Sequence, residues 1–268
     1  KPALYAVEAA TQLARRNDSE IILLNVVESP GPSFSVASGE TKDYGDYGFY
    51  TVKLIARTKL ELSKIISQPA YQDVKISPSI HVGNAYKAIA KEIAEQSVDL
   101  VVMGSNGSDG WEETLVGSNA EKVVRYAKCP VLVIKDKVEV ANIKDIAFAA
   151  NFWEQEDQVI IKIKTLQEAL GAQLHLVKIN TPTDFSVDHA TKQTIEQFAK
   201  KYQLQNYTVN VYNDQAPEEG IISFAAEIKA QLIALATHGR TGLGQLFNGS
   251  IAEGVVNHAK RPVWTCRI

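Results

Sequence analysis

The sequence predicts an α/β protein made of two tandem, doubly wound domains with parallel sheets. Two observations carry this prediction. Apolar, β-branched runs alternate with helical segments, which is the pattern of a parallel sheet covered by helices on both faces. A glycine motif that follows one of these runs also occurs twice, at an offset of 132 residues from position 104 to position 236. Its copies are Gly104-x2-Gly107-x9-Gly117-Ser118 and Ala236-x2-Gly239-x9-Gly249-Ser250.

An internal repeat divides the chain into two halves. Tyr86–Lys135 aligns with Glu218–Arg267 without a gap, and identical residues fall at turn, helix-cap and core positions. The length of 268 residues also suits two domains of ordinary size. The join falls in the polar stretch Asp136–Ala141, so we expect one domain over residues 1–138 and a second over residues 139–268.

Strands and helices alternate in order along the first half. Pro2 suits the first turn of a helix because its fixed φ matches that position. Glu20–Val27 is apolar and β-branched, as in a strand that is buried on both faces. Helices are expected over residues 2–17, 51–67, 86–96 and 119–127, and strands over residues 20–27, 74–82, 98–103 and 130–134. Residues 28–50, rich in Ser, Gly, Pro and Tyr, are expected to form a loop.

The second half repeats this order with one addition. A strand over residues 143–150 precedes its first helix, expected over residues 156–170, whereas the first half begins inside the matching helix. A doubly wound sheet without its first strand loses a central member and the hydrogen bonds of that member. We therefore expect about ten residues to precede Lys1 in the complete protein. A strand donated by a neighbouring chain is the alternative.

Composition and charge exclude some classes of function. Hydrophobic residues make up 45% of the chain, and its net charge of −3 is spread over interspersed acids and bases. That distribution argues against a nucleic-acid surface or a polybasic membrane surface. No apolar run approaches the ~20 residues of a membrane span. The two cysteines, Cys129 and Cys266, read as small buried side chains in a reducing cytoplasm, where we expect the protein to reside.

The glycine motif has the features of an anion cradle. In an open parallel sheet, ligands bind beyond the carboxyl ends of the strands. Gly104 follows such a strand and lets the backbone approach a ribose or phosphate, and Gly117-Ser118 opens a helix whose N-terminus favours negative charge. The alternative is that these glycines only make turns.

Taken together, three sets of residues resemble those of tandem universal stress proteins, over essentially the whole chain. They are the two glycine motifs, the strand endings Leu23–Val27 and Leu176–Ile179, and the terminal Ala-Lys-x-Pro-Val segments. The resemblance implies a five-stranded parallel sheet in each domain and binding of ATP or another adenine nucleotide. It also implies that Val26 and Ile179 pack on adenine, and that an Asp after the first strand helps to hold the nucleoside.

The resemblance and the glycine motifs together define the candidate nucleotide-binding residues. In the first half these are Val26, Gly104, Ser105, Asn106, Gly107, Gly117, Ser118 and Asn119. In the second half they are Asn151, Ile179, Thr237, His238, Gly239, Arg240, Gly249 and Ser250. Arg240 is placed to pair with phosphate, or else is a solvated loop residue.

The two halves depart from the family pattern in different ways. The first half retains all its motif glycines, but the loop carries Asp109, Glu112 and Glu113, and the Asp of the first strand is not in the sequence. In the second half Asn151 stands where the family has Asp, and Ala236 replaces the first glycine. We therefore expect an asymmetric protein with its stronger site in the first half.

Nothing in the sequence supplies a catalytic centre. His238 has no nucleophile or acid partner, the five histidines lack ligand spacing, and there is no P-loop of the Gly-x4-Gly-Lys-Ser/Thr type. We expect no dedicated metal site, although Mg²⁺ bound through the phosphates is compatible with the sequence. A stress-response protein that binds and senses nucleotide is favoured, and a scaffold with decayed sites or a slow ATPase are the alternatives.

Two further expectations concern partners. The aromatic residues of the loop, Tyr44, Tyr47, Phe49 and Tyr50, would cover a base as a lid or pack against another subunit. The resemblance implies that the two halves pair through their last strands, Val131–Ile134 and Val263–Cys266, which are apolar edges that would otherwise be exposed. Further homodimerisation is compatible with this arrangement.

Overall fold

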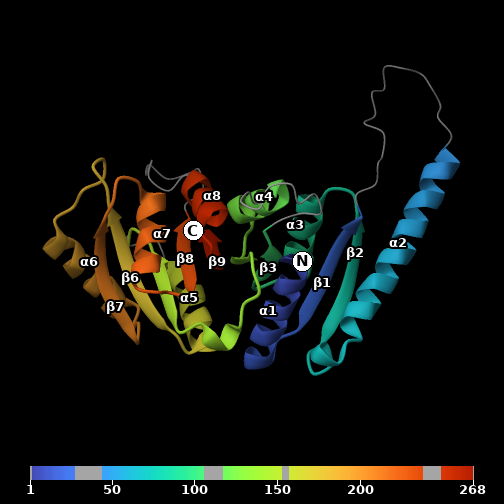
Figure 1. The fold of residues 1–268 in the computed structure, drawn as a ribbon, viewed down its shortest axis with the longest axis horizontal. Coiled ribbons are helices and arrows are strands. Elements are labelled where there is room, and N and C mark those ends of the chain that lie inside the picture. The colour runs from blue at the N-terminus through green and yellow to red at the C-terminus, as the bar shows by residue number, and fades with distance from the viewer. Residues whose placement is uncertain (1, 28–43, 106–116, 153–156, 238–248, 268) are drawn as a thin grey trace, which may run out of the picture.

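The computed structural model describes residues 2–27, 44–105, 117–152, 157–237 and 249–267. Helices and strands alternate through both halves, and the sheets are built mainly from parallel pairs, as the sequence predicts (Figure 1). Among the described residues, no helix combines the length and the apolar character needed to span a membrane.

The second half holds a complete parallel sheet of five strands in the order β7-β6-β5-β8-β9. The strands are β5 (Asp145–Ala149), β6 (Gln173–Asn180), β7 (Tyr207–Asn213), β8 (Leu232–Thr237) and β9 (Val263–Arg267). The helices are α5 (Asp157–Leu170), α6 (Asp188–Lys201), α7 (Pro217–Glu227) and α8 (Gly249–His258). Strand order reverses beside β5, so the expected doubly wound topology is confirmed.

The central strand β5 explains how this sheet is held together. Ile146 and Phe148 on one of its faces join one apolar cluster, and Ala147 and Ala149 on the other face join a second cluster. Because alternate side chains of a strand point to opposite faces, a run that is apolar at every position can be covered by helices on both sides. The second half therefore has two core layers with β5 between them.

Among the described residues, the first half has the same elements except a counterpart of β5, and its strands do not form one sheet. The strands are β1 (Ile21–Val27), β2 (Ile76–Val82), β3 (Val101–Gly104) and β4 (Val131–Ile134), and the helices are α1 (Pro2–Asn17), α2 (Tyr44–Ile66), α3 (Ala85–Glu95) and α4 (Ser118–Tyr126). Single 3₁₀ turns occur at Pro69–Tyr71 and Val140–Asn142. β1 and β2 form a separate parallel pair, which lies next to α2 at one end of the molecule (Figure 1). β3 and β4 form a second parallel pair.

The β3–β4 pair extends the sheet of the second half. β4 lies antiparallel to β9, with Val131 opposite Thr265, Leu132 opposite Trp264 and Val133 opposite Val263. This contact produces a seven-stranded sheet in the order β3-β4-β9-β8-β5-β6-β7. Trp264 is almost completely buried at the junction. The two halves therefore share one core across the last strand of each.

The predicted start of the second helix is wrong. A loop was expected as far as residue 50, but α2 starts at Tyr44 and includes all four aromatic residues of that segment. Gly45 and Gly48 favour a loop by about 1 kcal/mol each in local propensity. The long helical run that follows outweighs this cost, because adding residues to an existing helix is easier than nucleating one. Residues 28–43, which hold the rest of the expected lid, lie outside the described residues.

Candidate functional site

The candidate site of the first half lies where β1 and β3 end. A cavity of about 2600 Å³ runs between these strands. Five of the predicted residues line it: Val26, Gly104, Ser105, Gly117 and Asn119. Ser118 is the first residue of α4, and Asn106 and Gly107 lie outside the described residues. The structure thus brings together every predicted first-half residue whose side chain or glycine backbone it describes.

Backbone hydrogen bonds hold the two ends of the glycine motif together. The amide of Ser105 donates to the carbonyl of Ile134 at 3.1 Å, and the amide of Gly117 donates to the carbonyl of Ser105 at 2.7 Å. Gly117 then caps α4 in an extended conformation, and its carbonyl accepts from the amide of Ala120 at 2.8 Å. The first turn of α4 is therefore fixed against the end of β3, beside the cavity.

Gly104 is needed because α1 lies directly against it. A Cβ at position 104 would stand 2.7 Å from the carbonyl carbon of Pro2 and 2.8 Å from the nitrogen of Ala3. Real Cβ atoms do not approach backbone that closely, so only glycine fits without movement. The sequence predicts that this glycine allows close approach of a ribose or phosphate, whereas in the structure its close neighbour is the first turn of α1.

The N-termini of α1 and α4 therefore both lie at the end of the cavity where β1 and β3 finish. Ala3 of α1 and Asn119 of α4 both line it. The N-terminus of a helix carries partial positive charge and N–H groups that lack partners within the helix. Glu121 in the first turn of α4 opposes an anion, since its charge is negative. Helix N-termini of this kind can attract an anion, and the Glu121 carboxylate counteracts that attraction.

Among the corresponding residues of the second half, those whose burial the structure describes are enclosed by the protein itself. Ile179 and Ala236 are 5% and 2% exposed. A Cβ at Gly220 would stand 2.6 Å from Cγ2 of Ile179, so α7 packs directly on the residue expected to contact adenine. Thr237 ends β8, Gly249 and Ser250 begin α8, and His238, Gly239 and Arg240 lie outside the described residues.

Asn151 is already hydrogen-bonded within the second half. Its side-chain oxygen accepts from Nζ of Lys178 at 3.0 Å, and the same ammonium forms an ion pair with Asp184. Lys178 is 9% exposed, which requires such partners because an unpaired buried charge is costly. Sequence reasoning missed this cluster, although a lysine inside an otherwise apolar strand was a signal that could have revealed it.

A second polar cluster, missed at the sequence level, includes Ser79 and Glu92, which line the cavity of the first half. Oε1 of Glu92 accepts a hydrogen bond from the hydroxyl of Ser79 and lies 2.7 Å from Nε2 of His81. The hydroxyl of Ser79, and secondarily His81, holds the pKa of the Glu92 carboxyl below its usual value. Position 92 aligns with Phe224, which is buried and packs against Tyr212. The cluster is thus a property of the first half, and the signal for it was the Glu-to-Phe mismatch in the repeat.

The thiols show no sign of reactivity. Burial raises the pKa of Cys266 to about 11 and also raises the pKa of Cys129. A thiol that stays protonated at neutral pH is a poor nucleophile and a poor metal ligand. Within the part of the chain that the structure describes, no group of three or more His, Cys, Asp or Glu side chains could hold a metal ion.

Comparison with known proteins assigns both halves to one family. The family model described as the universal stress protein family matches residues 1–135 and again residues 142–267. A putative universal stress protein of Staphylococcus haemolyticus is 26% identical over 141 residues, which is 50% of this chain and 77% of that protein. The repeat seen in the sequence is therefore a repeat of a whole family domain.

Solved structures show the same fold over the full length. A universal stress protein from Archaeoglobus fulgidus DSM 4304 covers 100% of this chain and 95% of its own, with 19% identity and a TM-score of 0.73. Another universal stress protein from Archaeoglobus fulgidus, in complex with dAMP, covers 48% of this chain and 98% of its own, at 16% identity and a TM-score of 0.36. Because the structural similarity to that protein is so low, its bound dAMP does not identify a ligand of this chain.

Proposed function

The chain belongs to the universal stress protein family, and we propose that it is a stress-response protein that binds an adenine nucleotide, ATP foremost, in its first half. One observation carries the proposal. Val26, Gly104, Ser105, Gly117 and Asn119, which are separated by up to 93 positions (119 − 26), line the part of the cavity that lies at the carboxyl ends of β1 and β3. That is the edge at which open α/β sheets bind ligands.

Electrostatics at this edge support a phosphate-bearing ligand. The N-termini of α1 and α4 both begin there, and each contributes partial positive charge and backbone donors. Val26 is half-buried beside this end of the cavity and offers an apolar contact for a base. Phosphates would lie at Gly117 and Ser118, and Mg²⁺ would be held by the phosphates themselves.

We assign the second half a structural role. Ile179 is covered by α7, and the oxygen of Asn151 accepts from Lys178. A nucleotide entering there would have to displace packed apolar contacts and a buried charge cluster, both of which oppose binding. We place the boundary between the two domains at residues 138 and 139, and the second domain serves to complete the shared sheet.

The proposed activity is binding and sensing, without a dedicated catalytic centre. No described residue combines the position and the neighbours of a general base or nucleophile at the glycine motif. The second candidate function is a scaffold that works through protein contacts, and the enclosed second site favours it for that half. A slow ATPase would require phosphate release that falls in Ser118→Ala.

Isothermal titration calorimetry with ATP, ADP and AMP tests the proposal. Ser118 and Ser250 occupy equivalent positions at the start of α4 and α8, so they form a matched pair. A hydroxyl that donates to a charged phosphate contributes about 1.5–3 kcal/mol. Ser118→Ala should therefore weaken binding by roughly 10-fold or more, and Ser250→Ala should not change it. Heat-silent titrations with all three nucleotides would favour the scaffold.

A further inference from the structure

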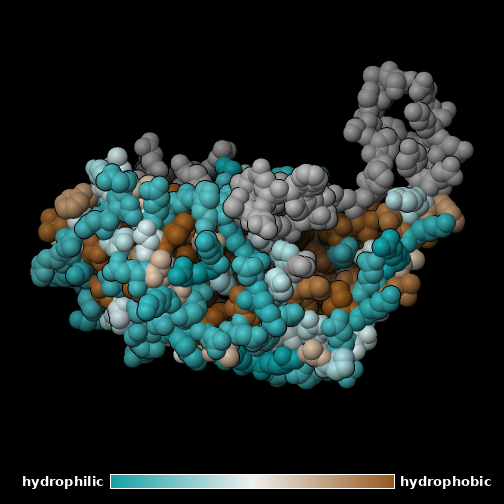
Figure 2. Space-filling model, in the orientation of Figure 1, coloured by the Kyte–Doolittle hydropathy of each residue, from teal (hydrophilic) through white to brown (hydrophobic). Residues whose placement is uncertain are grey.

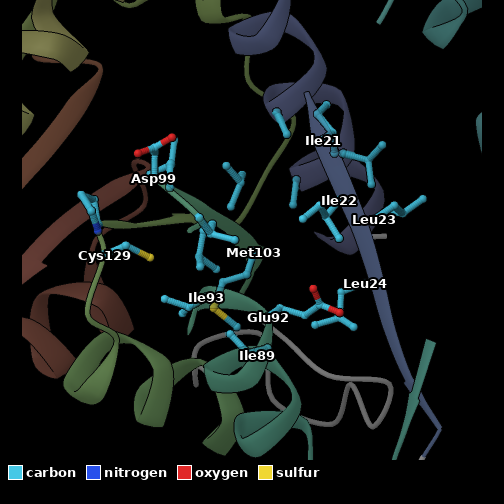
Figure 3. A pocket seen from close by; sticks show the side chains of 18 of the residues that line it. Ile21, Ile22, Leu23, Leu24, Ile89, Glu92, Ile93, Asp99, Met103 and Cys129 are labelled. Carbon is cyan, nitrogen blue, oxygen red and sulfur yellow. The ribbon is translucent and has the colours of Figure 1, made fainter. Parts of the chain in front are cut away.

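Four strand edges have no strand neighbour among the described residues, one each on β1, β2, β3 and β7. Those of β1 and β3 border the large cavity of the first half, where Figure 3 shows Leu24 of β1 on one side and Met103 of β3 on the other. On the face drawn in Figure 2, apolar groups gather in a hollow beside α2. The edges of β2 and β7 instead lie toward opposite ends of the molecule, where a second molecule can reach them (Figure 1).

The strand β7 is partly exposed along its whole length. Six of its seven residues are half-buried and Asn213 is exposed. The neighbouring strand β6 is buried at six of its eight positions. This difference is that between an edge strand and a strand inside a sheet, so solvent reaches β7 from its free side.

Hydrogen bonds fix which backbone groups of β7 face the free side. The amide of Leu174 donates to the carbonyl of Asn206 at 3.0 Å, and the amide of Asp214 donates to the carbonyl of Asn180 at 3.0 Å. In a parallel ladder, alternate residues direct both N–H and C=O to the same neighbour. The even-numbered residues of β7 thus bond to β6. Four residues direct their backbone groups outward, without another backbone partner among the described residues: Tyr207, Val209, Val211 and Asn213.

The equivalent edge of the first half is interrupted. The hydrogen bonds at the two ends of β2 repeat those of β7 at an offset of 131 residues (206 − 75 and 214 − 83). Pro78 then occupies the place of Val209, and a proline has no N–H to offer to a further strand. Proteins use proline in this way to prevent pairing at an edge. β7 contains no proline, glycine or charged residue, so the second half keeps an edge that is competent to pair.

The free edge of β7 is complementary to itself. A two-fold axis through Asn210 sets two copies of β7 antiparallel, with Val209 opposite Val211 and Tyr207 opposite Asn213. Every outward-facing residue then meets another outward-facing residue, and each such pair exchanges two hydrogen bonds. Because β7 carries no charged side chain, no like charges face each other within the paired strands.

The molecule already contains a join of this kind. β4 and β9, the last strands of the two halves, lie antiparallel and edge to edge through three residue pairs. Across this join α4 packs beside α8, and α1 packs beside α5. Helices can therefore flank an antiparallel edge contact between two such domains without separating the strands.

We propose that the free edge of β7 is an interaction surface for a second copy of this chain. The two β7 strands pair antiparallel about Asn210, and one sheet then runs through both molecules. An identical strand supplies the matching donors, acceptors and valine contacts in a single register, which favours a second copy over an unrelated segment. The surface lies in the second half, so it is independent of the proposed nucleotide site.

The test compares the unmodified chain at two protein concentrations that differ roughly 100-fold, by sedimentation velocity and by amide hydrogen exchange. A dimer should form at the higher concentration. The outward-facing amides of β7 should then exchange roughly 10-fold more slowly, because the monomer fraction falls with the square root of the concentration. The amides of Thr208, Asn210 and Tyr212, which bond to β6, should not depend on concentration.

Two proline variants form a matched pair. Asn213→Pro and Val82→Pro each remove one outward-facing N–H, at equivalent and exposed positions of β7 and β2. Asn213→Pro should weaken the dimer by roughly 10-fold, because each copy loses a hydrogen bond across the axis. Val82→Pro should leave the dimer unchanged. Slow exchange at Thr208 and Asn210 in the variant shows that β6 and β7 still pair.

Three results would overturn the proposal: a chain that stays monomeric at the higher concentration, a dimer that leaves exchange at the outward-facing amides of β7 unchanged, or a dimer that Val82→Pro weakens equally. The first result would leave the edge to an extended segment of another protein. The other two would place the interface elsewhere on the molecule.

Discussion

Gly104→Ala is the substitution whose effect the structure defines most sharply. The new methyl group would stand 2.7 Å from the carbonyl carbon of Pro2 and 2.8 Å from the nitrogen of Ala3. Both are backbone atoms, so no flexible side chain can move aside, and the first turn of α1 or the end of β3 must shift. Overpacking of this kind lowers the free energy of unfolding by about 1–3 kcal/mol.

The chain provides a matched control at position 236. Ala236 occupies the equivalent place at the end of β8 and is buried with its methyl group accommodated. Ala236→Gly should lower the free energy of unfolding by about 0.5–1 kcal/mol, because glycine gains more freedom on unfolding. The two variants make opposite exchanges of glycine and alanine at equivalent positions. Together they distinguish the effect of the α1 contact at position 104 from the general effect of replacing one residue type by the other.

Urea unfolding followed by circular dichroism measures both variants. For a cost of about 2 kcal/mol and an m value of about 3 kcal/mol/M, the midpoint should fall by roughly 0.7 M in Gly104→Ala. Hydrogen exchange should also accelerate in the first turn of α1. An unchanged midpoint, together with unchanged exchange in α1, would refute the close packing of this helix on Gly104.

Three other predictions concern the clusters and the junction. Because Ser79 depresses the pKa of Glu92, the resulting stabilisation is present above about pH 4.5 and is lost as pH falls through the folded pKa. The unfolding free energies of the unmodified chain and of Glu92→Gln should thus converge as the pH falls into the acid range. If the two free energies instead change in parallel with pH, the stabilising hydrogen bond to Glu92 is refuted. Asp184→Asn should lower the free energy of unfolding by about 3 kcal/mol, because it leaves Lys178 without its counter-charge. Thermal unfolding measures this loss, and an unchanged melting temperature would refute the pairing. Trp264→Ala should lower the free energy of unfolding by about 3–5 kcal/mol. Calorimetry measures this change, and a loss under about 1 kcal/mol would contradict the burial of Trp264.

The fold could be predicted from the sequence because its strands carry a local signature. A parallel strand covered on both faces is apolar at successive positions, and this rule identified β4, which is buried throughout. It also identified β1, but the expectation that β1 is buried on both faces was wrong, because only Val27 of this strand is buried. The repeat also predicted that the first half lacks a central strand, and a cavity of about 2600 Å³ lies between β1 and β3. The start of α2 was misplaced because Gly45 and Gly48 lower the helix propensity of the few residues around them. Helix propagation depends instead on the longer helical segment that follows.

The candidate site was predictable only in part. Glycines and a helix start are visible in a single sequence, so Gly104, Gly117 and Asn119 could be predicted as candidate site residues without the structure. The contact between Gly104 and α1 was not, since it joins segments about 100 residues apart. The pair formed by Lys178 and Asn151 likewise depends on strands that meet only in the folded sheet. Such partners are set by tertiary packing, which local patterns do not encode.

The central claim is that the first half holds the single nucleotide site. Native mass spectrometry of the chain with ATP gives the number of nucleotides bound per chain directly. We predict one, and none in Asn119→Asp, because the added carboxylate at the start of α4 repels phosphate. Two nucleotides per chain, or one that survives Asn119→Asp and is lost in Ser250→Ala, would contradict the claim.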